Sequence, residues 1–259
     1  MKKTIISCVL FLTAVTAFSQ TPMKTAAEAK LSASDLAVKI ADRILATTTY
    51  EFKNTKTGKT YKSVKNLPLD MNVKVACKYN NWHYTNGVTH IALMELADKT
   101  GAKKYDDYVL KNMNFVFNEG NLDFFKKQYD QAMKNEGWYG VRKLSWHMIF
   151  RGKRLDDNGP MGASLIDLQM KHPNNSFLNY INETAEHLNY GEPRLADGTI
   201  ARIWPHENTI WADDAFMAIS FLARMAKMTG DMSYINDAAN QVIKYHKYLW
   251  CPEKRILYH

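Results

Sequence analysis

One segment of this sequence recurs with the length of a helical hairpin. WHYTNGVTHIALMELADKTGAKKY (82–105) aligns without a gap with WADDAFMAISFLARMAKMTGDMSY (211–234), so that the tryptophans, the Thr-Gly pairs and the final tyrosines coincide. A looser copy, DNGPMGASLIDLQMKHPNNSF (157–177), has proline in place of the glycine and phenylalanine in place of the tyrosine. Repeats of this kind are typical of helical arrays, in which each unit buries its apolar face against its neighbours.

Each copy predicts an inner helix followed by an outer helix. Residues 215–228 are apolar on nearly every side, as in a buried helix, whereas residues 231–249 carry one apolar stripe at helical spacing. The same contrast separates residues 87–99 from residues 103–117. Gly230 suits the left-handed residue that ends a helix. We therefore predict an all-α fold of inner and outer helical hairpins, which form either a closed α/α toroid or an open solenoid.

The rest of the chain adds further predicted helices at 34–48, 121–135 and 175–189. Residues 50–64 (YEFKNTKTGKTYKSV) are predicted as a long loop or a brief hairpin, because strand signals are sparse elsewhere. Apolar residues make up 46% of the 259 residues, which is enough to bury a full core.

Residues 1–19 have the pattern of a secretory signal peptide. The basic start MKK precedes a short apolar stretch, IISCVLFLTAV, and small residues that suit cleavage after Ser19. We therefore predict that residues 20–259 form the mature helical-hairpin domain, which is periplasmic or secreted, with no segment long enough to span a membrane. Cys77 and Cys251 remain after cleavage and allow at most one disulfide.

The formal net charge of +8 limits the classes of partner. A basic exported protein could bind nucleic acid, membrane headgroups or an acidic polysaccharide, and export argues against nucleic acid. The basic residues are scattered among acidic ones rather than gathered in one tract, which is also typical of an ordinary solvated surface. We expect no nucleic-acid partner and no membrane partner.

Two pairs of aspartates open predicted inner helices. Asp213 and Asp214 precede AFMAISFL, and Asp156 and Asp157 precede NGPMGASL. Aspartate before a helix caps free backbone amides, so capping is one interpretation of both pairs. The repeat also places Tyr84, Asp157 and Asp213 at nearly the same position of their units, where inner helices of a ring converge. The alternative interpretation is a catalytic pair of carboxylates facing a shared cavity.

Aromatic residues are expected at the same level of the repeat as these acids, and other catalytic motifs are missing. Trp204 and Trp211 precede Asp213, and Trp82 and Tyr84 are at the matching positions of the first copy; all four suit the apolar faces of sugar rings. The sequence has no HExxH, CxxC or GxSxG motif, so we expect no metal, no cofactor and no serine nucleophile.

The last part of the sequence, residues 197–259, reads DGTIARIWPHENTIWADDAFMAISFLARMAKMTGDMSYINDAANQVIKYHKYLWCPEKRILYH. This segment resembles the unsaturated rhamnogalacturonyl hydrolases of glycoside hydrolase family 105. These are related to the unsaturated glucuronyl hydrolases of family 88. The resemblance continues through LDDNGPMGASLIDL (155–168) and WHYTNGVTHIAL (82–93). It implies an (α/α)6 toroid, which needs twelve helices. The chain contains about eight predicted helices and ends at His259 within the family's conserved segment, so we expect the ring to be incomplete.

The resemblance also implies roles for particular residues. Asp213 matches the catalytic acid and base of the family, and Asp157 takes the place of its second carboxylate. The matched pocket positions are Tyr84, Trp211, Met217 and His259. Trp82, beside Tyr84, joins them as a candidate for binding sugar, and Arg202 and His206 are candidates for binding the substrate carboxylate.

The implied substrate is an acidic oligosaccharide derived from pectin that ends in a 4,5-unsaturated uronic acid. A protonated carboxyl gives H⁺ to C4 of the vinyl ether, water adds at C5, and the resulting hemiketal opens. One carboxyl can act as acid and then as base only if its pKa is raised, by burial or by a second carboxylate. Two alternatives remain: another α/α-toroid glycosidase or lyase, and a non-catalytic helical-repeat protein that binds carbohydrate.

Overall fold

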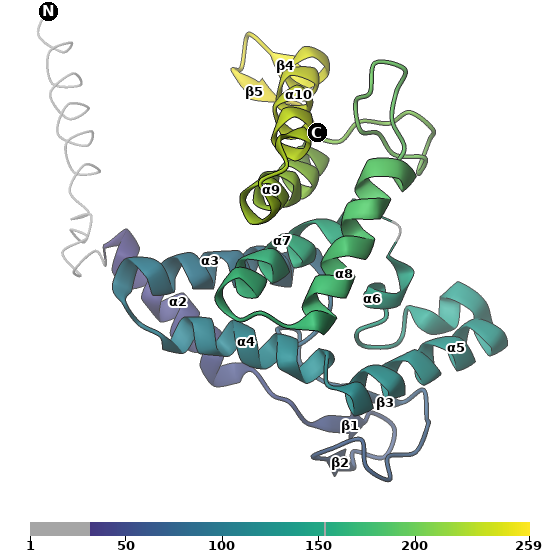
Figure 1. The fold of residues 1–259 in the computed structure, drawn as a ribbon. Coiled ribbons are helices and arrows are strands. Elements are labelled where there is room, and N and C mark those ends of the chain that lie inside the picture. Colours follow the sequence, from purple (N-terminus) through teal and green to yellow (C-terminus); the bar gives the residue numbers. More distant parts are fainter. Residues whose placement is uncertain (1–31, 153) are drawn as a thin grey trace, which may run out of the picture. The chain divides into compact units, whose positions relative to one another are not determined.

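The computed structural model describes residues 32–152 and 154–259, and the predicted signal peptide lies outside them (Figure 1). The chain divides into two compact units, with the boundary after Ile40. In the first unit, Ser32 and Asp35 each accept a hydrogen bond from the other's backbone N–H at a helix start. This reciprocal pattern is a capping box, which satisfies two of the free amides of the first turn.

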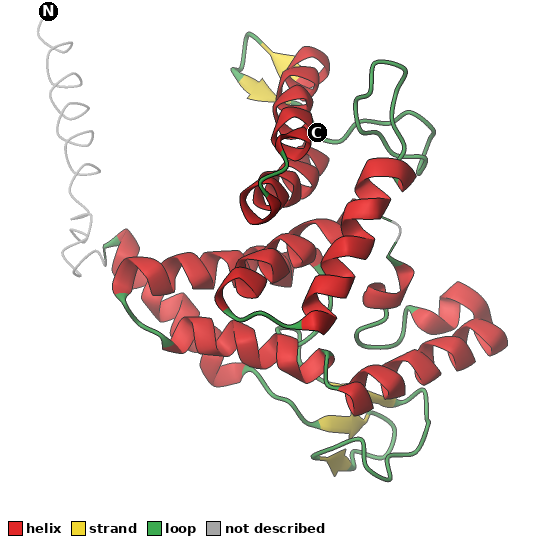
Figure 2. Ribbon diagram, in the orientation of Figure 1, coloured by secondary structure: helices red, strands yellow, loops and turns green. Residues whose placement is uncertain are grey.

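Helices dominate the described residues, and Figure 2 shows how few strands accompany them. The helices are α2 (Ala33–Thr47), α3 (Tyr84–Thr100), α4 (Lys104–Val116), α5 (Glu119–Val141), α6 (Met148–Arg151), α7 (Leu155–Lys171), α8 (Asn175–Glu186), the π-helical turn η1 (His187–Gly191), α9 (Ala212–Thr229) and α10 (Met232–Leu249). The all-α class predicted from the sequence is confirmed.

The three repeat copies form the hairpins α3–α4, α7–α8 and α9–α10 in the second unit (Figure 1). Helix α7 packs against both α3 and α9, and each outer helix packs against the inner helix before it. Helix α7 is buried along almost its whole length, as expected for an inner helix. The prediction of inner and outer helices is therefore confirmed.

The turns of the hairpins follow the sequence signals. Gly101 and Gly230 end α3 and α9 with φ angles of 70° and 75°, in the left-handed region that favours glycine. Helix α7 instead ends at Lys171, two residues before Pro173, which lacks the N–H needed to continue a helix.

Two glycines let the inner helices approach at backbone distance. A Cβ atom built on Gly87 of α3 would lie 2.3 Å from the backbone of Pro160 in α7. A Cβ on Gly159 of α7 would lie 2.6 Å from the carbonyl oxygen of Met217 in α9. No larger side chain fits at either contact, so these two glycines fix the spacing of the three inner helices.

Short strands complete the fold. The region predicted as a loop or hairpin contains β1 (Phe52–Asn54) and β2 (Thr60–Tyr61), which pair antiparallel, and β3 (Val73–Val75) joins β1 on its other edge. A second hairpin, β4 (Trp250–Cys251) with β5 (Ile256–Leu257), follows α10. The sequence did not predict β3, β4 or β5, because strands of two or three residues carry too short a pattern to detect.

The other predicted helices are present with shifted ends. The helix predicted at 121–135 is the longer α5, which is interrupted at Gly137, a residue with non-helical angles (φ 58°, ψ −149°). The helix predicted at 175–189 ends as α8 at Glu186 and continues as the π-helical turn η1. Helix α6 was not predicted.

We predict that Gly159→Ala lowers the free energy of unfolding by about 1–3 kcal/mol, the usual cost of an overpacked core. The added methyl meets backbone atoms, which cannot move aside. Denaturant unfolding monitored by circular dichroism measures the change.

Gly120→Ala in the first turn of α5 is the matched control. Its new Cβ would lie 3.3 Å from a side-chain methyl of Val64, which can shift. We expect this variant to stay within about 1 kcal/mol of the parent. Equal destabilisation by the two substitutions would contradict the close-packing argument.

Candidate active site

The two aspartate pairs lie in the first turns of adjacent inner helices. Asp156 and Asp157 belong to α7, and Asp213 and Asp214 belong to α9. The N-cap residues of both helices make no side-chain capping bond, and three of the four carboxylates bind arginine side chains. The capping interpretation is therefore wrong, although the positive ends of the helices still favour negative charge here.

Arg202 connects three of these carboxylates. Its guanidinium donates two hydrogen bonds to Asp214, at 2.6 and 2.7 Å, and reaches Asp156 at 3.2 Å. Its Nη2 lies 4.0 Å from Oδ1 of Asp213, and its Cζ lies 4.0 Å from the ring centroid of Trp211. Arg202 is held in place by a backbone bridge to Thr209, so the loop before α9 delivers the cation to the acids.

Burial and pairing oppose each other in this cluster. Burial alone lowers the pKa of Arg202, but its hydrogen bonds and attraction to Asp214 and Asp156 outweigh that effect and raise it. Burial raises the pKa of Asp214, and Arg202 opposes the rise without cancelling it. The guanidinium is therefore permanently charged and compensates the acids around it.

Asp157 lies apart from this cluster. Its side chain is fully buried, and its two oxygens accept hydrogen bonds from Nε and Nη2 of Arg151. Burial raises the pKa of Asp157, with Arg151 opposing the rise. The sequence predicted that Asp157 faces a cavity shared with Asp213, and this placement is corrected: the α7 carboxylate that joins Asp213 at Arg202 is Asp156.

The reason for the correction is the geometry of the helix. Successive residues of an α-helix point about 100° apart, so neighbouring carboxylates on one turn face different surroundings. Asp156 faces Arg202 across the α7–α9 contact, and Asp157 faces Arg151 at the end of α6. The repeat alignment fixed the level of the two residues along the helix but not the side from which each projects.

Asp213 lies within a group of predicted site residues. Its side chain is 41% exposed, and its Oδ1 lies 3.8 Å from Nδ1 of His259. The rings of Trp211 and His259 are 5.2 Å apart. Oδ1 itself is buried and accepts no hydrogen bond from any described residue. The structure thus brings together four residues that are candidates from the sequence: Asp213, Trp211, His259 and Arg202.

Two other residues predicted to contact substrate, Trp82 and Met217, are buried in the core. Trp82 is fully buried, donates its Nε1–H to the carbonyl of Asp157 at 2.7 Å, and packs edge-on against Tyr180. Met217 is 3% exposed and lies against α7. Both are core residues rather than parts of an exposed sugar platform, because they follow the packed faces of their segments.

Tyr84 and His206 are accessible to solvent but lie outside the Arg202 cluster. Tyr84 is half-buried against the core, with its ring 4.5 Å from that of His83. His206 is exposed in the loop before α9, and its carbonyl accepts a hydrogen bond from the Thr209 hydroxyl. Neither contacts the Arg202 cluster through a hydrogen bond or ion pair among the described residues.

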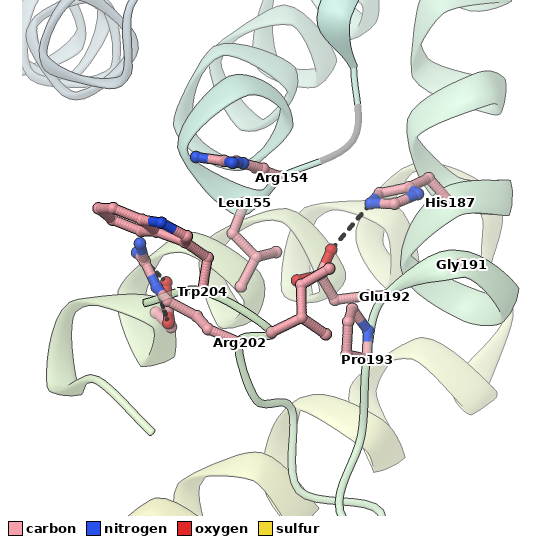
Figure 3. A pocket seen from close by; sticks show the side chains of 10 residues that line it. Arg154, Leu155, His187, Gly191, Glu192, Pro193, Arg202 and Trp204 are labelled. Atoms are coloured by element: carbon pink, nitrogen blue, oxygen red, sulfur yellow. Dashed lines mark hydrogen bonds and ion pairs between the residues drawn. The ribbon is translucent and has the colours of Figure 1, made fainter. Parts of the chain in front are cut away.

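A cavity of about 380 Å³ adjoins the cluster. Its lining includes Arg154, Arg202, Trp204 and Asp214, and Figure 3 shows the first three of these side chains. The cavity wall also includes His187 and Glu192, which face each other in the same view.

Glu192 is a site residue that the sequence did not reveal. Its Oε2 lies 2.8 Å from Nε2 of His187, directly after the π-helical turn. Burial, reinforced by repulsion from Asp214, raises the pKa of Glu192 from 4.5 to about 8. A shifted carboxyl in a cavity is a frequent mark of a functional site. Only tertiary packing creates this environment, since the local sequence YGEPR contains no corresponding motif.

The described residues include no group of three or more His, Cys, Asp or Glu side chains placed to hold a metal ion. None of the described helices has the length and hydropathy of a membrane span. Cys77 and Cys251 are both free thiols, so the disulfide that the sequence allowed does not form.

The family model described as Glycosyl Hydrolase Family 88 matches residues 55–259. No curated protein matches the chain.

Three solved structures are similar in fold. They are described as a possible GH105 family member from Salmonella enterica serovar Paratyphi A (14% identity, TM-score 0.55), a possible GH105 family member from Klebsiella pneumoniae (13%, 0.53) and a family 105 glycoside hydrolase from C. acetobutylicum (20%, 0.53). They cover 89%, 89% and 86% of this chain. The chain in turn covers 52%, 52% and 48% of those structures, about half of their length. At these identities the likeness establishes the fold, which is that of the predicted toroid family.

We predict that Arg202→Gln lowers the free energy of unfolding at pH 7 by about 3–5 kcal/mol, because it leaves Asp214 and Asp156 without their cation. Denaturant titration measures the loss. Arg224→Gln is the control: among the described residues Arg224 forms an ion pair with Asp167 and with no other carboxylate, and both side chains are 21% exposed. We expect that loss to be about 1 kcal/mol. A smaller loss at Arg202 than at Arg224 would refute the central role of Arg202.

A second prediction concerns pH. The folded chain holds a proton on Glu192 up to about pH 8, whereas the unfolded chain releases it near the ordinary value of 4.5. The stability that the folded protein gains from protonated Glu192 is fully present below pH 4.5 and is lost as pH rises to about 8. The stability of Glu192→Gln relative to the parent should therefore increase across that window and level off above it.

Thermal or denaturant unfolding of both proteins between pH 4.5 and 9 tests this expectation. Glu253→Gln is the control, because Glu253 is exposed and its pKa is lowered by hydrogen bonds to its own backbone and to Cys251. Its relative stability should not change between pH 5 and 9. A flat difference for Glu192→Gln would mean that Glu192 titrates normally.

Proposed function

The chain belongs to glycosyl hydrolase family 88, and from that membership we propose that it acts on oligosaccharides ending in a 4,5-unsaturated uronic acid. Because it spans about half of the solved structures that it resembles, its activity and substrate are inferred from the site rather than from those structures. We propose that the substrate derives from pectin, specifically from a rhamnogalacturonan.

The observation that carries this proposal is the environment of Asp213. Its Oδ1 is buried and accepts no hydrogen bond from the described residues, although Arg202 and His259 lie within 4.0 Å. A buried carboxylate oxygen without a donor needs an explanation, and a proton that moves during catalysis supplies one. The side chain remains 41% exposed, so a substrate can reach it.

The proposed reaction begins with a protonated Asp213. Its proton goes to C4 of the vinyl ether, the C4=C5 electron pair forms the new C–H bond, and positive charge develops at C5 and the ring oxygen. The Asp213 carboxylate then takes a proton from water as the water oxygen bonds to C5. The resulting hemiketal opens and releases the neighbouring sugar as an alcohol. Asp213 is regenerated in its protonated form, so the cycle needs no other reagent.

The neighbouring residues have separate tasks in this scheme. Asp214 and Asp156 anchor Arg202, whose charge is then nearly compensated. Trp211, with its ring beside His259, offers an apolar wall that limits water around Asp213.

We predict that the 259-residue protein removes the ultraviolet absorbance of an unsaturated disaccharide produced by a pectin-degrading lyase. Asp213→Asn should lower kcat by about 10²–10⁴-fold, the usual contribution of general acid–base catalysis. Continuous absorbance assays measure both effects.

Asp231→Asn is the matched control. Asp231 is exposed at the opposite end of α9, where it caps α10, and asparagine caps helices equally well. Its activity should stay within about twofold of the parent. Full activity of Asp213→Asn would exclude the mechanism, and binding of the disaccharide without loss of absorbance would favour a non-catalytic carbohydrate-binding protein.

A further inference from the structure

Three arginines lie near the first turns of α7 and α9, and they differ in their partners. Arg151 binds Asp157, and Arg202 binds Asp214 and Asp156. Arg154, the N-cap residue of α7, is exposed and makes no ion pair with a carboxylate of the described residues. The charge of Arg154 acts through space on the buried Asp157, but its guanidinium binds no carboxylate directly and is available to a ligand, whereas Arg151 and Arg202 already bind carboxylates.

Arg154 lies next to an exposed tryptophan. Its Cζ is 5.8 Å from the ring centroid of Trp204, within the range of a cation–π interaction, and both residues line the 380 Å³ cavity (Figure 3). Trp204 is 59% exposed, which is unusual for so large an apolar side chain. The loop that carries it is fixed by the two hydrogen bonds between the backbones of Arg202 and Thr209.

The acidic residues that line the cavity add little negative charge. Glu192 is paired with His187, and its pKa of about 8 keeps it protonated at neutral pH. Asp214 also faces the cavity, but Arg202 compensates it through two hydrogen bonds. Among the described residues that line the cavity, an anion beside Arg154 would therefore meet a guanidinium that forms no ion pair, and it would meet no uncompensated carboxylate.

We propose that Arg154 and Trp204 form a subsite for a carboxylate-bearing sugar ring, in which the guanidinium binds the carboxylate and the indole packs against the ring. This inference rests on the proposed function, because it identifies the acidic sugar as a part of that substrate. A guanidinium matches a carboxylate with two parallel N–H···O bonds, and an indole offers an apolar face to sugar C–H groups.

The subsite replaces the role assigned to Arg202 and His206 from the sequence. The guanidinium of Arg202 already donates hydrogen bonds to Asp214 and Asp156. His206 is exposed in the loop and does not line the cavity. Arg154, in contrast, forms no ion pair with a described carboxylate, and its side chain lines the cavity.

Binding without turnover tests the subsite separately from the reaction. In an Asp213→Asn background, isothermal titration calorimetry compares the unsaturated disaccharide with the same disaccharide carrying an amide in place of the carboxylate. Arg154→Gln should weaken binding of the acid at least tenfold and change binding of the amide less than twofold. Arg154→Lys should recover part of the affinity for the acid, because it restores the charge without the fork of donors.

The controls separate the two residues from general damage. Trp204→Ala should weaken both ligands similarly, because the ring contact does not depend on charge. Arg224 pairs with Asp167, and Arg224→Gln should change the affinity for neither the acid nor the amide. Equal weakening of acid and amide by Arg154→Gln, or unchanged affinity for the acid, would overturn the proposal. Failure of the absorbance assay alone would overturn the proposed reaction and leave the subsite standing.

Discussion

The close approach of the inner helices is the constraint on which the rest of the structure depends. Gly87 and Gly159 let α3, α7 and α9 touch at their backbones, so the first turns of α7 and α9 lie side by side. Each first turn carries two aspartates, and four carboxylates at such short range repel one another. The packing that builds the core therefore creates an electrostatic problem at its edge, and the loops that surround that edge must supply cations.

Two arginines resolve this problem and define the site at the same time. Arg151 binds Asp157 in the interior, and Arg202 binds Asp214 and Asp156 at the cavity. Among the described residues of these first turns, this distribution leaves Oδ1 of Asp213 without a hydrogen bond and Arg154 without an ion pair. Asp213 and Arg154, which the structural ion pairs do not use, are therefore the groups that we propose act on a charged sugar.

Family membership and site geometry contribute different kinds of information. The match to family 88 covers residues 55–259, and the solved structures agree with the fold at 13–20% identity. Those identities carry no assignment of residues, so the roles of Asp213, Arg154 and Trp204 rest on contacts within this chain. Glu192 illustrates the same point, because its raised pKa comes from burial beside Asp214 rather than from any motif.

The sequence by itself determined the helical hairpins, their inner and outer members, the turns at Gly101 and Gly230, and the level at which the aspartates meet. These features follow from periodicity and from local backbone preferences, which depend only on near neighbours in the chain. Tertiary structure decided which of Asp156 and Asp157 joins Asp213, that Trp82 and Met217 are core residues, and that Arg202 serves the acids rather than a ligand. Those outcomes depend on the rotation of each helix about its axis and on loops that return from distant parts of the chain, and neither is encoded in a local pattern.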